Sequence, residues 1–248
     1  MSNWTTPLRH PELASDEVHV WRARLDLPEE HIQAFEQVLA DDERARALRF
    51  RFQKDRTHFT AARGILRTLL GRYLVQPPAR LQFRYNQYGK PLLGDSDEEN
   101  ALRFNVSHSH GMALFAFTCG RDVGVDIEYM LADRAEMSIA RRFFSPYEVE
   151  ALQAVPEKQR TQAFYSCWTR KEAYVKTRGL GLSLDLNLFD VSLAPGEPAA
   201  LLNIREPGQR LEDWSLHDLA PGAGYAAALA LKGEPCRVVR WEWSVSQL

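Results

Sequence analysis

The stretch from residue 102 to residue 129 constrains the fold most, because it places three short strands close together between two helical regions. Alternating or continuous apolar residues predict strands over Leu102–Val106, Met112–Cys119 and Val123–Tyr129. A Gly-Arg-Asp turn at residues 120–122 separates the second strand from the third. The chain is therefore expected to be an α+β protein, with helices before and after a compact group of strands.

The helical regions on either side of this block resemble each other weakly. The segments that begin at Arg56 and Arg160 each place ionic residues four apart and each end at a glycine. We interpret this as an internal duplication, although the match is loose. It predicts two similar α/β halves, which we place at residues 1–120 and 121–248.

Other local patterns complete the outline. An alternating pattern predicts a strand over Val18–Leu25, and Pro28 opens a helical pattern after it. Ser145 is a good helix N-cap, with Pro146 at the first helical position and Glu148 completing a capping box. Helices are expected over residues 41–74 and 160–177, and several strands over residues 186–245.

Composition excludes several classes of protein. The 248 residues include 31 basic and 33 acidic ones, so the excess of positive charge typical of nucleic-acid-binding proteins is missing. The first residues lack the apolar core of a signal peptide, and no apolar run approaches the ~20 residues needed to span a bilayer. Three widely spaced cysteines suggest neither a disulfide framework nor a zinc site. We expect a cytoplasmic protein without a membrane or nucleic-acid partner.

The first candidate site lies in the sequence GVDIE at residues 124–128. On a strand, Asp126 and Glu128 project from the same face, while Val125 and Ile127 point into a core. Two neighbouring carboxylates repel each other unless a cation lies between them, and Mg²⁺ takes such oxygen ligands. The alternative from this pentapeptide alone is a pair of exposed acids at a sheet edge.

The second candidate lies in the helical sequence WTRKEAYVK at residues 168–176. Trp168, Glu172 and Lys176 share one helix face, with Lys171 beside them. That face could supply one metal ligand or base and two cations for phosphates. Alternatively, Glu172 and Lys176 form an ordinary ion pair in solvent.

Two further segments carry polar groups that could bind phosphate. The sequence FNVSHS at residues 104–109 ends a strand with Ser107 and His108, and Lys90 is held in a Gly-Lys-Pro turn. The His-x-His pair at 108 and 110 has no cysteine or third histidine nearby, so zinc is not indicated. The sequence GAGYAA at residues 222–227 precedes a predicted strand, whereas a dinucleotide site requires a helix there.

The order and spacing of FNVSHS, GVDIE and WTRKEAYVK followed by RGLGLS resemble those of the 4′-phosphopantetheinyl transferase superfamily. The upstream Gly-Lys-Pro turn and the RRFFS sequence at 141–145 fit as well, so that the similarity runs roughly from Asp41 to Leu231. The chain length is similar to that of the surfactin-synthetase-activating type and not to the half-size trimeric type.

This resemblance implies both a fold and an activity. The fold is two similar α/β halves, each an antiparallel sheet packed against a long helix, with the active site in the cleft between them. The activity is magnesium-dependent transfer of the phosphopantetheine arm of coenzyme A to a serine of an acyl or peptidyl carrier protein, releasing 3′,5′-ADP. Mn²⁺ is a possible substitute for Mg²⁺. Carriers of fatty-acid, polyketide or nonribosomal peptide biosynthesis would be the partners, and a monomer is expected.

The resemblance also assigns roles to individual residues. It implies that the metal ligands are Asp126, Glu128 and Glu172. As a hypothesis on the mechanism, Glu172 would accept the serine proton, directly or through a metal-bound water, and Lys176 would stabilise or protonate the departing 3′,5′-ADP. It implies that coenzyme A is bound by Arg46, Lys90, Ser107, His108 and Lys176. The choice of Arg46 is made against its neighbours Arg44 and Arg49.

Two other functions remain open from the sequence. One is a non-catalytic module that binds coenzyme A or a carrier protein. The other is a metal-dependent hydrolase of coenzyme A or nucleotides. A non-catalytic module would not need the three carboxylates Asp126, Glu128 and Glu172, so their presence argues against it. A hydrolase would be identified by release of free phosphopantetheine without a carrier protein.

Overall fold

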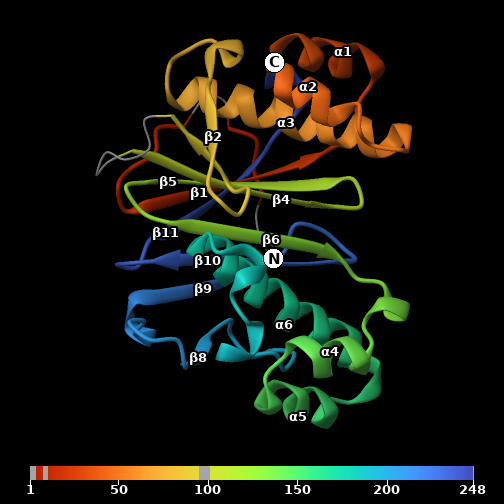
Figure 1. The fold of residues 1–248 in the computed structure, drawn as a ribbon, viewed down its shortest axis with the longest axis vertical. Coiled ribbons are helices and arrows are strands. Elements are labelled where there is room, and N and C mark those ends of the chain that lie inside the picture. Colours follow the sequence, from red (N-terminus) through yellow and green to blue (C-terminus); the bar gives the residue numbers. More distant parts are fainter. Residues whose placement is uncertain (1–3, 8–10, 95–100, 248) are drawn as a thin grey trace.

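The first half of the chain contains one strand, three helices and four more strands in that order (Figure 1). The structure is a computed structural model and describes residues 4–7, 11–94 and 101–247. The elements are β1 (Glu17–Arg24), α1 (Glu29–Val38), α2 (Asp41–Ala47), α3 (Gln53–Tyr73), β2 (Phe83–Tyr85), β3 (Pro91–Leu93), β4 (Leu102–Ser109) and β5 (Met112–Cys119).

The second half repeats this order. Its elements are β6 (Val123–Tyr129), α4 (Met137–Phe143), α5 (Pro146–Ala154), α6 (Glu157–Arg178), β7 (Phe189–Val191), β8 (Leu201–Ile204), β9 (Trp214–Leu219) and β10 (Tyr225–Lys232). The strands also pair alike: β1-β5-β4 in the first half corresponds to β6-β10-β9 in the second, and the hairpin β2-β3 corresponds to β7-β8. The expected architecture of two similar α/β halves is confirmed.

The last strand departs from this symmetry. β11 (Arg237–Glu242) joins the sheet of the first half and pairs parallel with β1. We expected an antiparallel sheet in each half, and this one pairing differs from that expectation. The division of the chain between residues 120 and 121 stays a prediction. It does not account for β11, which follows the second half in sequence but belongs to the sheet of the first half.

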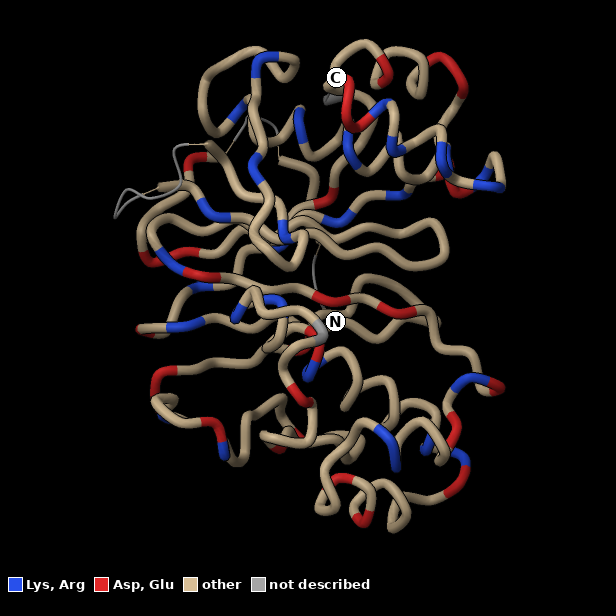
Figure 2. The backbone as a smooth tube through the Cα atoms, viewed as in Figure 1, with Lys and Arg blue, Asp and Glu red and all other residues tan. Residues whose placement is uncertain are grey.

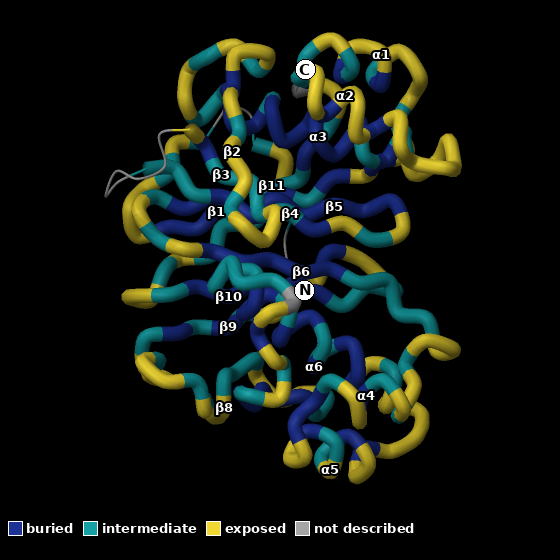
Figure 3. The backbone as a smooth tube through the Cα atoms, in the orientation of Figure 1, coloured by how far each residue is buried: buried dark blue, intermediate teal, exposed yellow. Residues whose placement is uncertain are grey.

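The halves stack as four layers, with helices outside and the two sheets between them (Figure 1). Figure 3 shows that burial follows these layers, because the central strands β5, β6 and β10 and much of the long helices α3 and α6 are buried. One apolar core lies between α1, α3 and the first sheet, and another lies between α6 and the second sheet. A third core joins the sheets, with Val20 and Leu114 on one side and Val125 and Leu229 on the other.

Several local predictions are confirmed in detail. The Ser145 side chain accepts a hydrogen bond from the Glu148 amide at the start of α5, and Glu148 reaches back to the Ser145 amide. Gly179 ends α6 in the left-handed conformation at φ 65°, which costs glycine least. The strand expected to end at Val106 continues to Ser109, so that Ser107 and His108 lie within β4.

The duplication extends to buried charges. In each half, a glutamate at the third position of a short helix, α2 or α5, forms an ion pair with a basic side chain of the long helix that follows. Arg67 Nε lies 2.6 Å from Glu43 Oε2, and Lys171 Nζ lies 2.8 Å from Glu148 Oε2. Arg67 and Lys171 also follow Arg56 and Arg160 by the same number of residues. The weak sequence similarity between the two segments therefore reflects a shared structural unit.

Buried His19 should make the protein sensitive to acid. Its Nδ1 lies 2.7 Å from the Tyr73 hydroxyl and its Nε2 lies 3.0 Å from Glu17. Burial lowers the pKa of His19 to about 4. The unfolded chain takes up this proton near pH 6.5, so between pH 6.5 and 4 protonation favours unfolding. We expect His19 to account for a loss of about 3 kcal/mol in the free energy of unfolding over this window.

Urea unfolding at pH 6.5 and pH 4.5 tests this expectation. The variant His19→Gln should lose less free energy of unfolding between the two pH values than the wild type. Equal losses in the two proteins would show that His19 does not cause the acid sensitivity.

Candidate functional site

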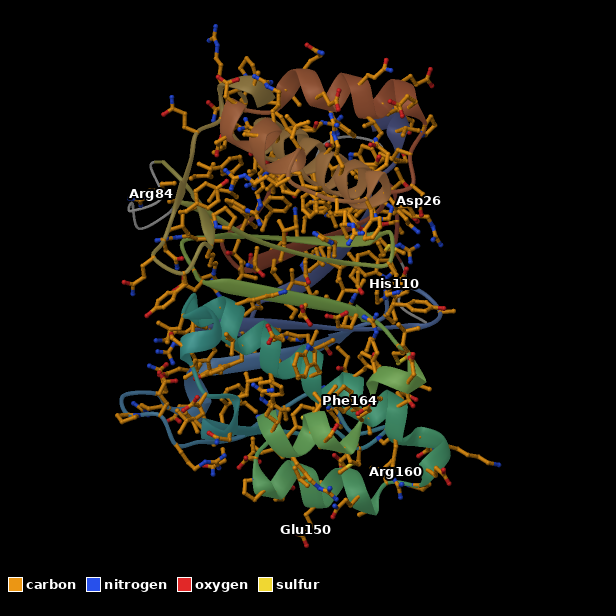
Figure 4. All side chains as sticks on the ribbon, turned by 45° about the vertical axis from the view of Figure 1, so that its right-hand side comes forward. Asp26, Arg84, His110, Glu150, Arg160 and Phe164 are labelled. Atoms are coloured by element: carbon orange, nitrogen blue, oxygen red, sulfur yellow. The ribbon has the colours of Figure 1, made fainter. Side chains whose placement is uncertain are left out.

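A cavity of about 410 Å³ opens between the two halves, where β4, β6 and α6 meet. Figure 2 shows acidic segments along β6 in the middle of the molecule and basic segments among the helices of the first half. Figure 4 shows His110, just beyond the end of β4, at this junction, whereas Glu150 and Arg160 lie in the outer helices of the second half. The residues lining the cavity are Val106, Ser107, His108, Asp126, Glu128, Trp168, Glu172 and Lys176.

Asp126 is the most buried carboxylate of this cavity, with 3 % of its surface exposed. Its Oδ1 accepts hydrogen bonds from Lys176 Nζ at 2.6 Å and from Ser107 Oγ at 2.9 Å. Its Oδ2 is buried and has no hydrogen-bond partner among the described residues. A buried carboxylate oxygen without a partner is costly, so it is a candidate ligand atom for a bound group.

Gly124 allows α6 to approach this strand closely. A Cβ atom at this position would lie 2.1 Å from the Ala173 carbonyl oxygen and 2.4 Å from the Thr177 amide nitrogen. Both are backbone atoms of α6, which cannot move away without disturbing the helix. The glycine of GVDIE therefore lets Asp126 and Lys176 reach each other across the two elements.

The other two carboxylates are more accessible and less acidic than usual. Burial and the charge of Asp126 raise the pKa of Glu128, and a hydrogen bond from Ser109 partly offsets this rise. Burial, Asp126 and Glu128 raise the pKa of Glu172, whereas Lys176 lowers it. Each of the three carboxylates therefore lies within the electric field of the others, and a cation among them would relieve their repulsion.

The donor set suits a hard cation such as Mg²⁺, because it offers carboxylate oxygens and one buried oxygen without a partner. The three carboxylates are not drawn together into a ligand cluster: no group of three or more Asp, Glu, His or Cys residues close enough to hold a metal occurs in the described part of the chain. Lys176 instead supplies the positive charge beside Asp126. A metal would have to replace or join that ammonium.

A second cavity of about 180 Å³ adjoins the first, since both are lined by Val106 and His108. Its other residues come from α2, α3 and the β2-β3 hairpin: Arg46, Phe59, Ala62, Arg63, Leu66, Tyr85, Gly89 and Pro91. The guanidinium of Arg46 lies 5.4 Å from the centre of the Phe59 ring. An aromatic surface beside cations suits a flat base attached to phosphates.

Each half of the chain matches a family of 4′-phosphopantetheinyl transferases. Residues 122–230 match the family described as the 4′-phosphopantetheinyl transferase superfamily, and residues 26–119 match a 4′-phosphopantetheinyl transferase N-terminal family. The 4′-phosphopantetheinyl transferase HetI of Nostoc sp. is 44 % identical over 221 residues, which are 89 % of this chain and 90 % of HetI. The chain belongs to the 4′-phosphopantetheinyl transferase superfamily.

More distant members of this superfamily are also similar. The 4′-phosphopantetheinyl transferase Sfp of Bacillus subtilis is 32 % identical over 67 % of this chain and 72 % of Sfp. The solved holo-[acyl-carrier-protein] synthase of Thermotoga maritima has 18 % identity and a TM-score of 0.37, covering 46 % of this chain and 63 % of that one.

Most residues that the superfamily resemblance implied lie at these two cavities. Asp126, Glu128, Glu172, Lys176 and Ser107 line the first, Arg46 lines the second, and His108 lines both. Arg44, a neighbour of Arg46, is placed differently, because it binds Asp41 at 2.6 Å and lines a separate cavity with Leu39. His108 is exposed, but the protein atoms around it reduce its hydration, and this desolvation together with the charge of Lys176 lowers its pKa.

Lys90 is placed differently from our expectation. Its Nζ donates hydrogen bonds to the carbonyl oxygens of Lys176, at 2.6 Å, and Val123, at 3.3 Å. Burial lowers its pKa to about 8. The Lys90 ammonium therefore caps the end of α6 and joins the hairpin of the first half to the second half. Neither of the two cavities is lined by Lys90 in the described part of the protein.

Lys171 also differs from what the helix pattern suggested. It is fully buried on the far side of α6, where its Nζ binds Glu148 and donates to the carbonyl oxygens of Leu186 and Phe189, both at 2.6 Å. It is therefore a structural residue and not a cation for phosphates.

Several residues that line the second cavity were not predicted from the sequence, among them Phe59, Arg63 and Tyr85. Ser109, whose Oγ lies 2.9 Å from Glu128 Oε2, was not predicted either. A signal existed for Ser109, because polar residues at 105, 107 and 109 alternate as on one face of a strand. Ending the strand at Val106 hid that alternation.

Proposed function

We propose that this protein transfers the 4′-phosphopantetheine arm of coenzyme A to a serine of an acyl or peptidyl carrier protein and releases 3′,5′-ADP. The observation that supports this most is a pair of adjoining cavities, one between the halves and one within the first half. One end offers an aromatic ring and Arg46, and the other offers three carboxylates and Lys176. This arrangement suits a nucleotide joined through a pyrophosphate to a reacting group.

Coenzyme A would lie across both cavities. The adenosine 3′-phosphate would lie near Arg46 and His108, which line the same cavity. The pyrophosphate would lie near His108 and Lys176, which line the other. Because Ser107 Oγ already bonds Asp126 and Lys176, it would reach the coenzyme only by rearranging those bonds.

Mg²⁺ would be held by Asp126, Glu128 and Glu172 after these side chains moved closer together, with Asp126 Oδ2 available as a ligand atom. When bound, the ion would neutralise negative charge on the pyrophosphate oxygens. Mn²⁺ prefers similar oxygen ligands and is expected to substitute.

The chain's own residues would then move one proton and stabilise one leaving group. The carrier serine oxygen forms a bond to the β-phosphorus of coenzyme A, while the bond from that phosphorus to the oxygen bridging the two phosphates breaks. The raised pKa of Glu172 makes its carboxylate a better acceptor for the serine proton. The Lys176 ammonium would stabilise the charge on the departing 3′,5′-ADP.

Carrier and assembly state belong to the same proposal. Because one chain supplies both halves of the cavity, a monomer would suffice for activity. None of the helices in the described ranges has the length and apolar character needed to cross a membrane. We propose that the enzyme acts in the cytoplasm on a carrier of fatty-acid, polyketide or peptide synthesis.

Intact-mass spectrometry tests the function directly. Purified protein, coenzyme A, Mg²⁺ and a panel of apo carrier proteins should give carriers heavier by one phosphopantetheine, and EDTA should abolish the gain. Coenzyme A binding without any mass gain would point to a non-catalytic module. Free phosphopantetheine formed without a carrier would identify a hydrolase, and absence of both binding and transfer would overturn the proposal.

A further inference from the structure

The junction between the two sheets is built from side chains. β4 and β6 are the edge strands of different sheets, and edge strands leave backbone groups unpaired. The amides of Val125, Ile127 and Tyr129 in β6 donate to side chains of β4 instead of to its backbone. The acceptors are Asn105 Oδ1 at 2.9 Å, Ser107 Oγ at 3.4 Å and Ser109 Oγ at 3.1 Å. We call these three residues the side-chain ladder.

The two serines of the ladder also reach the cavity carboxylates. Ser107 Oγ donates to Asp126 Oδ1 at 2.9 Å, and Ser109 Oγ donates to Glu128 Oε2 at 2.9 Å. A hydroxyl has one proton to donate and two lone pairs that accept. Each serine therefore accepts a bond from the backbone of β6 and directs its own proton to the preceding carboxylate of that strand.

Glu128 depends on this contact more than Asp126 does. Asp126 is also held by Lys176, whereas within the described residues the bond from Ser109 is the only hydrogen bond found for the Glu128 side chain. A glutamate side chain has several rotatable bonds, so its carboxylate loses a defined position when its partner is removed.

We propose that Ser109 is a positioning residue for the transferase reaction, because its hydroxyl restricts where the Glu128 carboxylate can lie when a divalent cation binds. This inference rests on the proposed function. Ser109 acts through Glu128 and does not touch the reacting atoms. Partners of metal ligands commonly change metal affinity by about 10- to 100-fold when they are removed.

Binding of Mn²⁺ alone, measured by electron paramagnetic resonance, tests the proposal without any turnover. The variant Ser109→Ala should bind Mn²⁺ about 10-fold more weakly than the wild type. The variant Ser109→Thr keeps the hydroxyl on a residue that suits a strand, and it should bind nearly as well as the wild type. In the transfer assay, kcat at fixed Mg²⁺ should fall for the alanine variant while KM for coenzyme A stays unchanged.

Asn105→Ala is the matched control, because it removes one step of the ladder that touches no carboxylate. It should lower the melting temperature and leave Mn²⁺ affinity unchanged. Unchanged Mn²⁺ affinity in Ser109→Ala would overturn the positioning role, and so would equal weakening in the alanine and threonine variants. If the wild type binds Mn²⁺ but modifies no carrier, the proposed function fails while the metal-binding comparison still decides the role of Ser109.

Discussion

The variant Glu172→Gln is expected to lose nearly all transfer activity while it still binds coenzyme A. Glutamine keeps the size of the side chain but can neither accept the serine proton nor offer a charged oxygen to a cation. Removing a general base typically costs about 10²- to 10⁴-fold, and loss of a metal ligand would add to that. We therefore expect kcat to fall at least about 10³-fold. The adenosine end of coenzyme A lies in the other cavity in our proposal, so its binding should change little.

The measurement is the rate of carrier mass gain, with coenzyme A affinity determined by isothermal titration calorimetry. Glu157→Gln is the matched control, because Glu157 is exposed at the far end of the same helix. That variant should behave like the wild type in both assays. Turnover near the wild-type rate in Glu172→Gln would contradict both the metal-binding and the proton-accepting role of Glu172.

The parts of the fold that depend on neighbouring residues could be predicted from the sequence. β5 and β6 have the expected bounds, and the capping box of Ser145 and Glu148 and the glycine at the end of α6 are confirmed. The same local geometry brought Asp126 and Glu128 to one face of a strand, and Glu172 and Lys176 to one face of a helix. All four line one cavity.

The parts that depend on distant contacts could not be predicted. The parallel pairing of β11 with β1 joins residues more than 200 positions apart, and nothing in the local pattern of either strand selects that partner. The place of Lys90 depends on the carbonyl of Lys176, which belongs to the other half. From the sequence, a lysine in a turn between glycine and proline is expected to be free to bind a phosphate. Only the fold shows that the end of α6 lies beside Lys90 and accepts a hydrogen bond from it.

Lys171 and Glu172 show the limit of helical spacing as a guide to function. Adjacent residues on a helix differ by about 100° in direction. Whether Lys171 faces the cavity with Glu172 or the core behind it depends on a partner, and that partner is Glu148 of α5. In the first half, Arg67 likewise forms a buried ion pair with Glu43 of the preceding short helix.

This buried pair gives the largest expected effect on stability. The variant Lys171→Met removes the ammonium that binds Glu148 and two backbone carbonyls, while the thioether fills most of the same space. Glu148 then remains as a buried charge that has lost its cation and keeps hydrogen bonds from the backbone amides of Ser145 and Val191. Breaking a buried ion pair from one side typically costs about 3–5 kcal/mol, and we expect the free energy of unfolding to fall by this amount.

Urea unfolding at pH 7 measures the effect, with Lys158→Met as the control because Lys158 is exposed on the same helix. An exposed substitution of this kind should change the free energy of unfolding by no more than about 0.5 kcal/mol. Below its unfolding temperature, folded Lys171→Met should retain Mn²⁺ and coenzyme A binding, since Lys171 does not line either cavity. A fully stable variant that has lost coenzyme A binding would reverse our assignment, because Lys171 would then serve the ligand and not the core.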